Sequence, residues 1–462
     1  MKKQIFILLL LFFSTQALAY RLPQLGDISE HSFSAYEEHK LGQEYFRTLQ
    51  HYLKIDRDPI VNAYIQEIGH RLASNSPDPH RRYTFFVVDD SSINAFAGPD
   101  GYIGINSGLL LKTQSDSELA AVLSHEIAHV AQHHIARSIA NQKQMGLSSL
   151  GAVLAAAAIG MINPTAGIGI LAGANAGSYQ HFLTYSRAFE QEADRIAVQI
   201  MAKAGYDPCS MPVFLKRIER DEQLNEIDIA HFLQSHPSTE SRLADADNRC
   251  VKGIIQTSPS ADFEIAQARL LSKQTQDVMQ FKMQCSKRKN LRNCYAYALT
   301  LANQKHYSQA IAHMHSLIKE HPSEIALTMS LADMYAQAGK QKQAIRILEQ
   351  NYRYNPDDLS LLYQYAQTLL LDKQYKRART LLEEQTINFP NNKSLLILLS
   401  TAQGKSGQLV TAYRTRAKVF LLNHQYNHAR EQLEMAKKLT RDATMRVQIK
   451  AQIKEISRKI KK

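Results

Sequence analysis

The sequence predicts a mainly α-helical protein that has a small β-sheet in its first half and an all-α solenoid at its C-terminal end. Three observations lead to this fold class. Apolar residues follow a helical period over long stretches, one short segment is rich in β-forming residues, and alanines and prolines of the last third recur every 34 residues. Apolar residues make up 44% of the 462 residues and charged residues 21%, as in a folded protein of two or three domains.

The first residues have the pattern of a signal peptide. Lys2 and Lys3 precede an apolar run at 5–13, and small residues follow at 17–19. This run is too short to cross the roughly 30 Å hydrocarbon layer of a membrane. We therefore expect residues 1–19 to be cleaved and the chain to be secreted.

Local patterns place the other elements of the first half. In chain order we expect a helical region at 33–72 with a break near 56–59, a strand at 83–88, a hairpin of 94–96 with 102–105, a helix that begins near Ser115 and runs past His134, and a helix at 185–204. The hairpin depends on the turn signal Gly98-Pro99-Asp100-Gly101. The helix start depends on the capping-box spacing of Ser115 and Glu118.

The segment 146–177 is rich in Ala, Gly, Ile and Leu, but Asn163-Pro164 and several glycines interrupt it. No uninterrupted apolar run in it is long enough to span a membrane. The pattern favours a buried or loosely packed pair of helices. The alternative is a mobile lid, or a patch that contacts a membrane or an unfolded protein.

Three sets of residues in the last third share a period of 34 residues. They are Pro322, Pro356 and Pro390; Ala310, Ala344, Ala378 and Ala412; and Ala298, Ala332 and Ala366. This is the period of tetratricopeptide repeats, in which small residues let two helices approach and a proline follows the second helix. We expect a first domain over 20–270, the repeats over 285–440, and a basic C-terminal helix or tail over 441–462.

The cysteines Cys209, Cys250, Cys285 and Cys294 allow three complete pairings. Proximity favours Cys285–Cys294, which leaves Cys209–Cys250, and a secreted chain would permit both bonds. Free thiols are the alternative. The scattered spacing is unlike that of a zinc-thiolate site.

The chain has a net charge of +12, from lysines and arginines that form no long block. A diffuse basic surface would suit anionic membranes, acidic proteins or nucleic acid. Peripheral contact with a membrane therefore stays an option. Because no nucleic-acid-binding motif is present, we expect no nucleic-acid partner.

The segment His125-Glu126-Ile127-Ala128-His129 indicates a metal site. Residues four apart lie on one face of a helix, so both imidazoles can reach one ion. Catalytic zinc takes three protein ligands and leaves a position for the attacking water, and Glu126 lies where it can act as general base. A solvated helix that carries histidines is the alternative, but the apolar flank at 119–123 predicts burial.

The third ligand does not follow directly from this motif. One class of zinc proteases has a histidine six residues after the second motif histidine, where this chain has Ile135. His133 lies two turns from His125, about 12 Å along the helix, which is too far for one ion. We expect His133 and His134 to be surface groups or to support the ligands.

The helix at 185–204 offers Glu190 and, one turn later, Asp194. Glu190 is a suitable third ligand, and Asp194 could accept a hydrogen bond from the outer nitrogen of a ligating imidazole. An acidic run of this kind is also typical of a solvated helix face. Spacing alone does not decide between the two interpretations.

The motif at 125–129 and the pair Glu190 and Asp194 resemble the metalloprotease family of the CAAX prenyl proteases and their bacterial relatives. The resemblance covers 41–247. It implies a gluzincin-type metalloprotease domain in which His125, His129 and Glu190 bind one Zn²⁺ ion and Glu126 is catalytic.

Two further segments are similar to that family. Asn94, Ala95, Phe96 and Ala97 resemble its edge strand, to which an extended substrate could add. His236, before Pro237, matches a histidine that approaches the metal in the family. His236 is then expected to occupy the open zinc position and hold the enzyme inactive, or to donate a hydrogen bond to the oxyanion. A histidine that merely caps a turn is the alternative.

Together with the signal peptide and the repeats, the resemblance is to members of the family from the periplasm of Gram-negative bacteria. It implies a zinc endopeptidase, combined with chaperone-like activity, in outer-membrane protein assembly and quality control. Its partners would be unfolded or partly assembled outer-membrane proteins and the barrel-assembly machinery, bound through the repeats. The alternative is a repeat-based binding protein or chaperone with latent proteolysis. Because convincing transmembrane helices are lacking, prenylated substrates are not expected.

Overall fold

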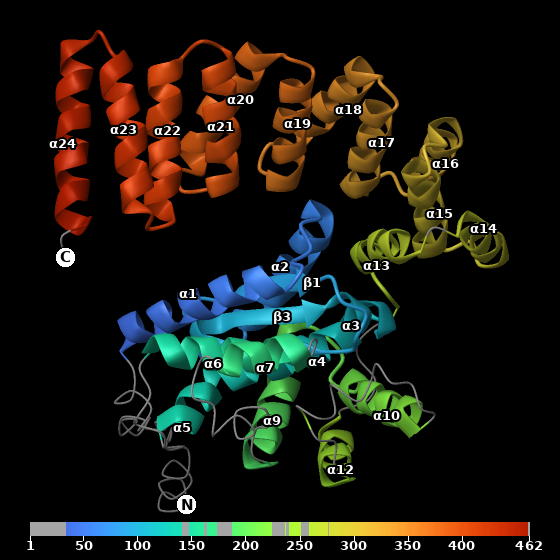
Figure 1. The fold of residues 1–462 in the computed structure, drawn as a ribbon. Helices are drawn as coiled ribbons and strands as arrows, with labels where there is room; N and C mark the ends of the chain where they lie inside the picture. Colours follow the sequence, from blue (N-terminus) through green and yellow to red (C-terminus); the bar gives the residue numbers. More distant parts are fainter. Residues whose placement is uncertain are drawn as a thin grey trace, which may run out of the picture.

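A row of helix pairs arches over a mixed domain of helices and a small sheet (Figure 1). The computed structural model describes residues 34–140, 147–160, 164–172, 187–223, 236, 240–250, 258–275 and 277–460. The signal peptide predicted at 1–19 lies outside these residues.

The mixed domain contains α1 (Ala35–Tyr52), α2 (Pro59–Ala73), β1 (Thr84–Val88), β2 (Ala95–Ala97), η1 (Pro99–Gly101), β3 (Tyr102–Asn106), α3 (Ser107–Lys112), α4 (Asp116–Ala131), α5 (His134–Ala140), α6 (Leu147–Gly160), α7 (Pro164–Ala172), α9 (Arg187–Ala204), α10 (Ser210–Gln223) and α12 (Glu240–Arg249). The row that follows contains α13 (Ala261–Gln274), α14 (Val278–Lys287), α15 (Leu291–Asn303), α16 (Tyr307–Glu320), α17 (Ile325–Gln337), α18 (Gln341–Tyr354), α19 (Leu359–Leu371), α20 (Tyr375–Asn388), α21 (Lys393–Lys405), α22 (Leu409–Leu422), α23 (Tyr426–Leu439) and α24 (Ala443–Ile460).

The sheet has the strand order β1-β3-β2. β1 runs parallel to β3, and β2 runs antiparallel to β3 with Ala95 opposite Ile105, which confirms the predicted hairpin. β2 pairs on one side only, so among the described residues it forms an edge of the sheet. In the turn, Gly101 has a φ of +73°, and a Cβ there would lie 2.0 Å from the carbonyl oxygen of Arg82. The turn therefore requires glycine at this position.

α4 is the buried centre of the mixed domain, and all its residues from Ser117 to Ala131 are buried. Ser115 caps its start by accepting a hydrogen bond from the Glu118 N–H, as the spacing predicts. The capping box is incomplete, because the Glu118 carboxylate does not accept from the Ser115 N–H. It accepts from the Gln114 N–H instead and pairs with Arg217 of α10. It thereby fastens the start of α4 to a neighbouring helix.

The prediction that this helix runs past His134 is wrong. α4 ends at Ala131, His133 has a left-handed φ of +53°, and α5 begins at His134. The left-handed residue turns the chain, so His134 lies close to the end of α4 instead of one turn beyond it.

The helix pair predicted within 146–177 is α6 and α7, in the part of that segment that the structure describes. α6 packs along α1 and against α7. At Gly167 the two helices touch, since a Cβ there would lie 2.6 Å from the Cα of Gly160. Nowhere in the described ranges does a helix combine the length and apolarity needed to cross a membrane.

The 34-residue period corresponds to antiparallel helix pairs. Six of its small residues are completely buried where paired helices meet: Ala298, Ala332 and Ala366 in the first helices, and Ala310, Ala344 and Ala378 in the second helices. Ala412 of α22, in the same register, is only partly buried. Pro322, Pro356 and Pro390 each lie two residues beyond the end of a second helix. The prolines thus stop each pair before the next begins.

α13 joins the two parts of the molecule. Phe263 and Leu270 enter the core of the mixed domain, and Ile265 and Ala268 enter the first core of the row. A boundary at residue 270 therefore falls inside a helix shared by both cores. At the other end of the row, α24 packs against α23.

The structure contains the disulfides Cys209–Cys250 and Cys285–Cys294, the pairing that proximity favoured. Cys209–Cys250 fastens the end of α12 to the start of α10. Cys285–Cys294 joins α14 to α15.

Candidate metal centre

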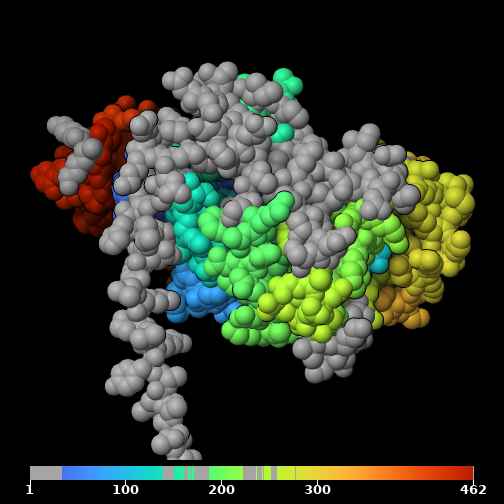
Figure 2. All heavy atoms as spheres, turned by 90° about the horizontal axis from the view of Figure 1, so that it is seen from below, coloured from blue at the N-terminus to red at the C-terminus, as the bar shows by residue number. Residues whose placement is uncertain are grey.

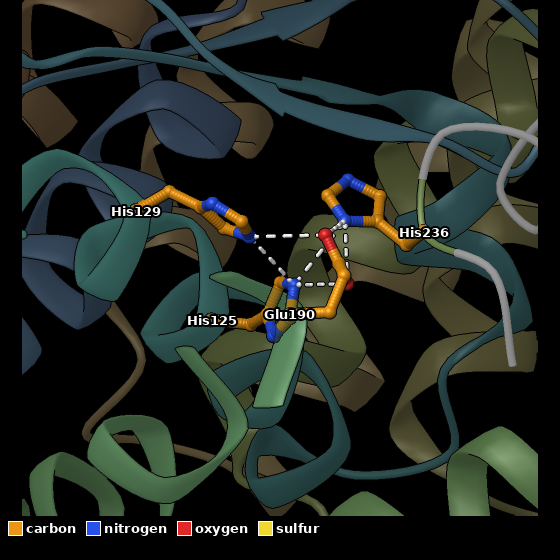
Figure 3. A group of neighbouring side chains, drawn as sticks. All are labelled: His125, His129, Glu190 and His236. Atoms are coloured by element: carbon orange, nitrogen blue, oxygen red, sulfur yellow. Dashed lines mark hydrogen bonds and ion pairs between the residues drawn. The ribbon is translucent and has the colours of Figure 1, made fainter. Parts of the chain in front are cut away.

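Two neighbouring helices and His236 bring four metal-binding side chains together. α4 carries His125 and His129 one turn apart, and α9, which packs along α4, carries Glu190. The four side chains point toward one another (Figure 3). All four are buried, and one ligand atom from each lies within 4.8 Å of the others.

The separations between these atoms have the size expected around one ion. Nε2 of His125 lies 3.0 Å from Nε2 of His129 and 3.3 Å from Oε2 of Glu190. Nδ1 of His236 lies 3.2 Å from Nε2 of His125 and 3.2 Å from Oε1 of Glu190. Two ligands of a tetrahedral zinc ion, at bond lengths near 2.0–2.1 Å, are roughly 3.3 Å apart. The four side chains could therefore hold one zinc ion.

Asp194 and Arg242 support this group from outside. Oδ1 of Asp194 lies 3.0 Å from Nδ1 of His125. Because a carboxylate only accepts, His125 carries a proton on Nδ1 and presents Nε2 to the site. Arg242 donates to both Asp194 oxygens, at 2.7 and 2.9 Å, and its Nη1 lies 2.9 Å from Oε2 of Glu190. Arg242 comes from α12, which lies beside α9 on one face of the domain (Figure 2).

His134 supports the other motif histidine. Its Nδ1 lies 2.9 Å from Nδ1 of His129, and its Nε2 lies 3.3 Å from Oε2 of Glu192. Since Glu192 accepts from Nε2 of His134, Nδ1 of His134 is left to accept from His129. The ring of His134 stacks on Phe189, with centroids 4.3 Å apart. The outer hydrogen bond thus directs Nε2 of His129 toward the site.

Glu126 lies beside the metal-binding group. Neither of its carboxylate oxygens makes a hydrogen bond within the described part of the chain, and Oε1 lies 3.4 Å from Nε2 of His236. Burial raises the pKa of Glu126, although His236, His125 and the backbone N–H of Ala97 partly offset this rise. A buried carboxylate with so few donors can still accept hydrogen bonds from a water or a substrate.

The electrostatics of the pocket favour a cation. Burial alone would lower the pKa of His125, but Glu190 and Asp194 raise it to about 10. A positive charge at this imidazole is therefore stabilised, whether a proton or a metal ion supplies it. Burial lowers the pKa of His129 well below its usual value, so this ring is neutral, as a metal ligand must be.

The predicted substrate segment meets the site at one end. β2 packs against α4, and the backbone N–H of Ala97 faces the Glu126 carboxylate. Ala95 and Phe96 are buried in the sheet, and Asn94 extends the pairing because its carbonyl accepts from the Asn106 N–H. The unpaired edge of β2 thus ends next to Glu126.

Comparison with known proteins relates the chain to a family. Peptidase family M48 matches residues 59–250, and Tetratricopeptide repeat matches residues 335–402. The Beta-barrel assembly-enhancing protease of Escherichia coli is 30% identical over 397 residues, which cover 83% of this chain and 80% of that protein. The protein of the same name from Yersinia pestis is 29% identical and covers 88% of this chain and 85% of its own length. The bovine mitochondrial Metalloendopeptidase OMA1 is 30% identical over 226 residues, 45% of this chain and 43% of the relative.

The chain belongs to peptidase family M48.

This M48 peptidase is a zinc-dependent metalloendopeptidase with a helical repeat domain. Bound zinc supplies a Lewis acid that polarises the scissile carbonyl and makes the attacking water more acidic. The donor set of the pocket, two imidazoles and a carboxylate with a third imidazole at the remaining position, suits this ion.

The four grouped side chains were all singled out beforehand, His125 and His129 from their spacing and Glu190 and His236 with the help of the family resemblance, but part of their surroundings was missed. Glu192 and Arg242 received no role from the sequence, and His134 was expected only as a surface or supporting group. A signal for Glu192 existed: it is three residues after Phe189, so both project from one face of α9. No local signal pointed to Arg242, because its partner Asp194 is 48 residues away.

Proposed function

We propose that this M48 peptidase is exported to the periplasm of a Gram-negative bacterium, where it cleaves unfolded or partly assembled outer-membrane β-barrel proteins. The observation that carries the proposal is the 30% identity, over 83% of this chain, to a protein named for β-barrel assembly. The signal peptide predicted at 1–19 supports export.

In the proposed reaction, His125, His129 and Glu190 hold the zinc ion. Glu126 takes a proton from the attacking water and later delivers it to the leaving amine. Two observations support this role: neither Glu126 oxygen makes a regular hydrogen bond within the described residues, and burial raises the pKa of Glu126. A base with a raised pKa binds the proton more readily and can then pass it on.

The substrate is proposed to add as a strand to the edge of β2, at Asn94, Ala95, Phe96 and Ala97. The position of Ala97 next to Glu126 supports this, because a strand along β2 would bring a peptide bond to the general base. Strand addition uses main-chain hydrogen bonds, so it accepts many sequences as long as the segment is extended. This recognition selects unfolded segments and rejects folded proteins.

His236 is proposed to fill the fourth zinc position in the resting enzyme. Its Nδ1 faces His125 and Glu190, and its Nε2 faces the general base at 3.4 Å. In this position the imidazole excludes the attacking water. After withdrawal, the same residue could donate a hydrogen bond to the oxyanion.

The repeats are proposed to bind β-barrel substrates and the barrel-assembly machinery. Helix pairs of this type form extended surfaces that bind proteins. The alternative function is a repeat-based chaperone with latent proteolysis. The buried position of His236 beside His125, His129 and Glu190 is the observation that favours this alternative, because a site closed by His236 would bind clients without cleaving them.

One experiment separates the two functions. The purified protein and a Glu126→Gln variant are mixed with an unfolded outer-membrane β-barrel protein, and cleavage, binding and zinc content are measured. We expect one zinc per chain in both, equal binding, and a loss of cleavage of roughly 10²-fold or more in the variant. Cleavage that persists in the variant would contradict the role of Glu126. No cleavage by either protein, with intact binding, would favour the chaperone function.

A further inference from the structure

The net positive charge of this chain arises from its C-terminal end. Residues 391–462 contain 16 lysines and arginines but 4 acidic residues, whereas residues 1–390 contain 39 of each kind. The last 72 residues therefore carry a net charge of +12, equal to that of the whole chain. This corrects the expectation of a diffuse excess, which overlooked the distribution because no run of adjacent charges marks it.

The last helix carries part of this charge on an exposed face. α24 buries Ile449 and Ile456 and packs against α23. Lys450, Lys454 and Arg458 are exposed and follow one another at four-residue intervals. We call these three residues the basic face of α24. None of them forms an ion pair with a carboxylate in the part of the chain that the structure describes.

The place of α24 in the fold leaves this face accessible. α24 is the last labelled helix of the row, with α23 on one side of it and, in the described part of the chain, no helix on the other (Figure 1). Val447 lies among the basic residues and is 68% exposed. The end of the row thus offers an exposed helix face of positive charge with one apolar side chain, Val447, beside it.

We propose that the basic face of α24 docks the protein on an anionic phospholipid surface. Clusters of four to eight lysines and arginines on an amphipathic helix are typical of proteins that bind acidic lipid headgroups. The basic residues of α24 are Arg446, Lys450, Lys454, Arg458 and Lys459, and its single acidic residue, Glu455, lies 3.6 Å from Lys459. Charge complementarity therefore identifies the occupant.

An acidic protein is the less favoured occupant. Specific protein interfaces are usually anchored by aromatic side chains that insert into pockets. α24 contains no aromatic residue, and its outward face is a convex helix surface. A flat layer of negative headgroups needs no pocket, because it is recognised through summed charge. Docking through α24 would hold the repeats at a membrane surface, independently of the metal centre.

The test uses the purified full-length protein and sedimentation with vesicles of phosphatidylcholine, with or without phosphatidylglycerol. We expect the protein to bind only to the vesicles that contain phosphatidylglycerol. The bound fraction should decrease as the salt concentration rises. A triple variant, Lys450→Gln with Lys454→Gln and Arg458→Gln, removes the basic face and keeps helix-forming residues. Its partition coefficient should fall by roughly tenfold or more.

A matched variant controls for net charge. Lys342→Gln with Arg346→Gln and Lys376→Gln removes the same charge from exposed positions on α18 and α20. We expect its partition coefficient to change by about twofold at most, because these residues lie outside the basic face. An equal loss in both variants would overturn the proposal. So would equal binding of wild-type protein to neutral vesicles, or binding to polyglutamate without binding to vesicles. Because the assay contains no protein substrate, its result is separate from that of the cleavage experiment.

Discussion

Nδ1 of His134 lies 2.9 Å from Nδ1 of His129, and this contact is made possible by a left-handed residue between the two helices that carry them. His133, with a φ of +53°, ends the turn after α4 and lets α5 fold back. His134 thereby becomes a completely buried support for a motif histidine. Glu192 and Phe189 of α9 hold it on the other side.

His134→Phe should weaken zinc binding. The phenyl ring keeps the stacking on Phe189, but it cannot accept a hydrogen bond from His129. Loss of such a support typically lowers metal affinity by roughly 10- to 100-fold. Competition with a zinc chelator measures the affinity directly. His133→Asn is the control, because asparagine tolerates the left-handed φ and His133 contacts Arg81 instead of a metal-binding residue. An equal loss of zinc affinity in both variants would contradict the role given to His134.

Arg242→Met should destabilise the mixed domain. The change leaves the carboxylates of Asp194 and Glu190 buried without their guanidinium partner, which costs about 3–5 kcal/mol for buried ion pairs. The free energy of unfolding from denaturant titration measures this cost. Arg249→Met on the same helix is the control, since Arg249 pairs with Asp245 at the surface and should contribute about 0.5 kcal/mol. A cost as small as that of the control would show that Arg242 is dispensable.

His236→Ala should increase proteolysis without unfolding the domain. The imidazole lies among the ligand atoms of His125, His129 and Glu190 and faces Glu126 at 3.4 Å, so its removal would open the site to water. Cleavage of an unfolded protein reports activity, and a thermal melt reports folding. A decrease in cleavage would instead assign His236 to oxyanion stabilisation, and unchanged cleavage would exclude both roles.

Removal of Cys209–Cys250 should affect stability and zinc retention together. The bond closes a loop with a sequence separation of 41. By lowering the entropy of the unfolded chain, a loop of this size adds about 4 kcal/mol to the free energy of unfolding. It also anchors α12, which carries Arg242. A double alanine variant should therefore lose zinc to a chelator faster than wild type. Cys285→Ala with Cys294→Ala is the control, because that bond lies in the repeats and should leave zinc retention unchanged.

The contact between the two parts of the molecule should weaken in acid. Asp58, the cap of α2, pairs with Arg269 and Lys273 of α13. Burial raises the pKa of Asp58, but these two cations outweigh it and hold the pKa below 3.8. A lowered folded-state pKa means that the stabilisation is present above pH 3.8 and is lost as pH falls below it through the folded-state value.

Asp58→Asn tests this pH dependence. Asparagine preserves the cap but not the ion pairs, so the variant should lose about 2 kcal/mol at neutral pH and show a smaller loss of stability in acid. Unfolding titrations at a series of pH values measure both effects. Asp358→Asn, at the equivalent cap of α19, is the control because Asp358 makes no ion pair within the described ranges. The same acid dependence in wild type and Asp58→Asn would refute the prediction.

Much of the site could be predicted because its central residues are close in sequence. His125, Glu126 and His129 share one helix, and the spacing alone places both imidazoles on one face. Glu190 and Asp194 stayed ambiguous, because an acidic helix face looks the same whether it meets a metal or water. The break at His133 was missed because no glycine or proline marks it.

The sequence by itself determined the motif helix, the hairpin and the 34-residue helix pairs, because each depends on a periodicity or turn signal within a few residues. Only the tertiary structure decided what surrounds the motif. His236 meets His125 across 111 residues, and Arg242 meets Asp194 across 48. Contacts over such distances depend on how α9, α10 and α12 pack against α4, and packing is a property of the whole buried core that no local pattern encodes.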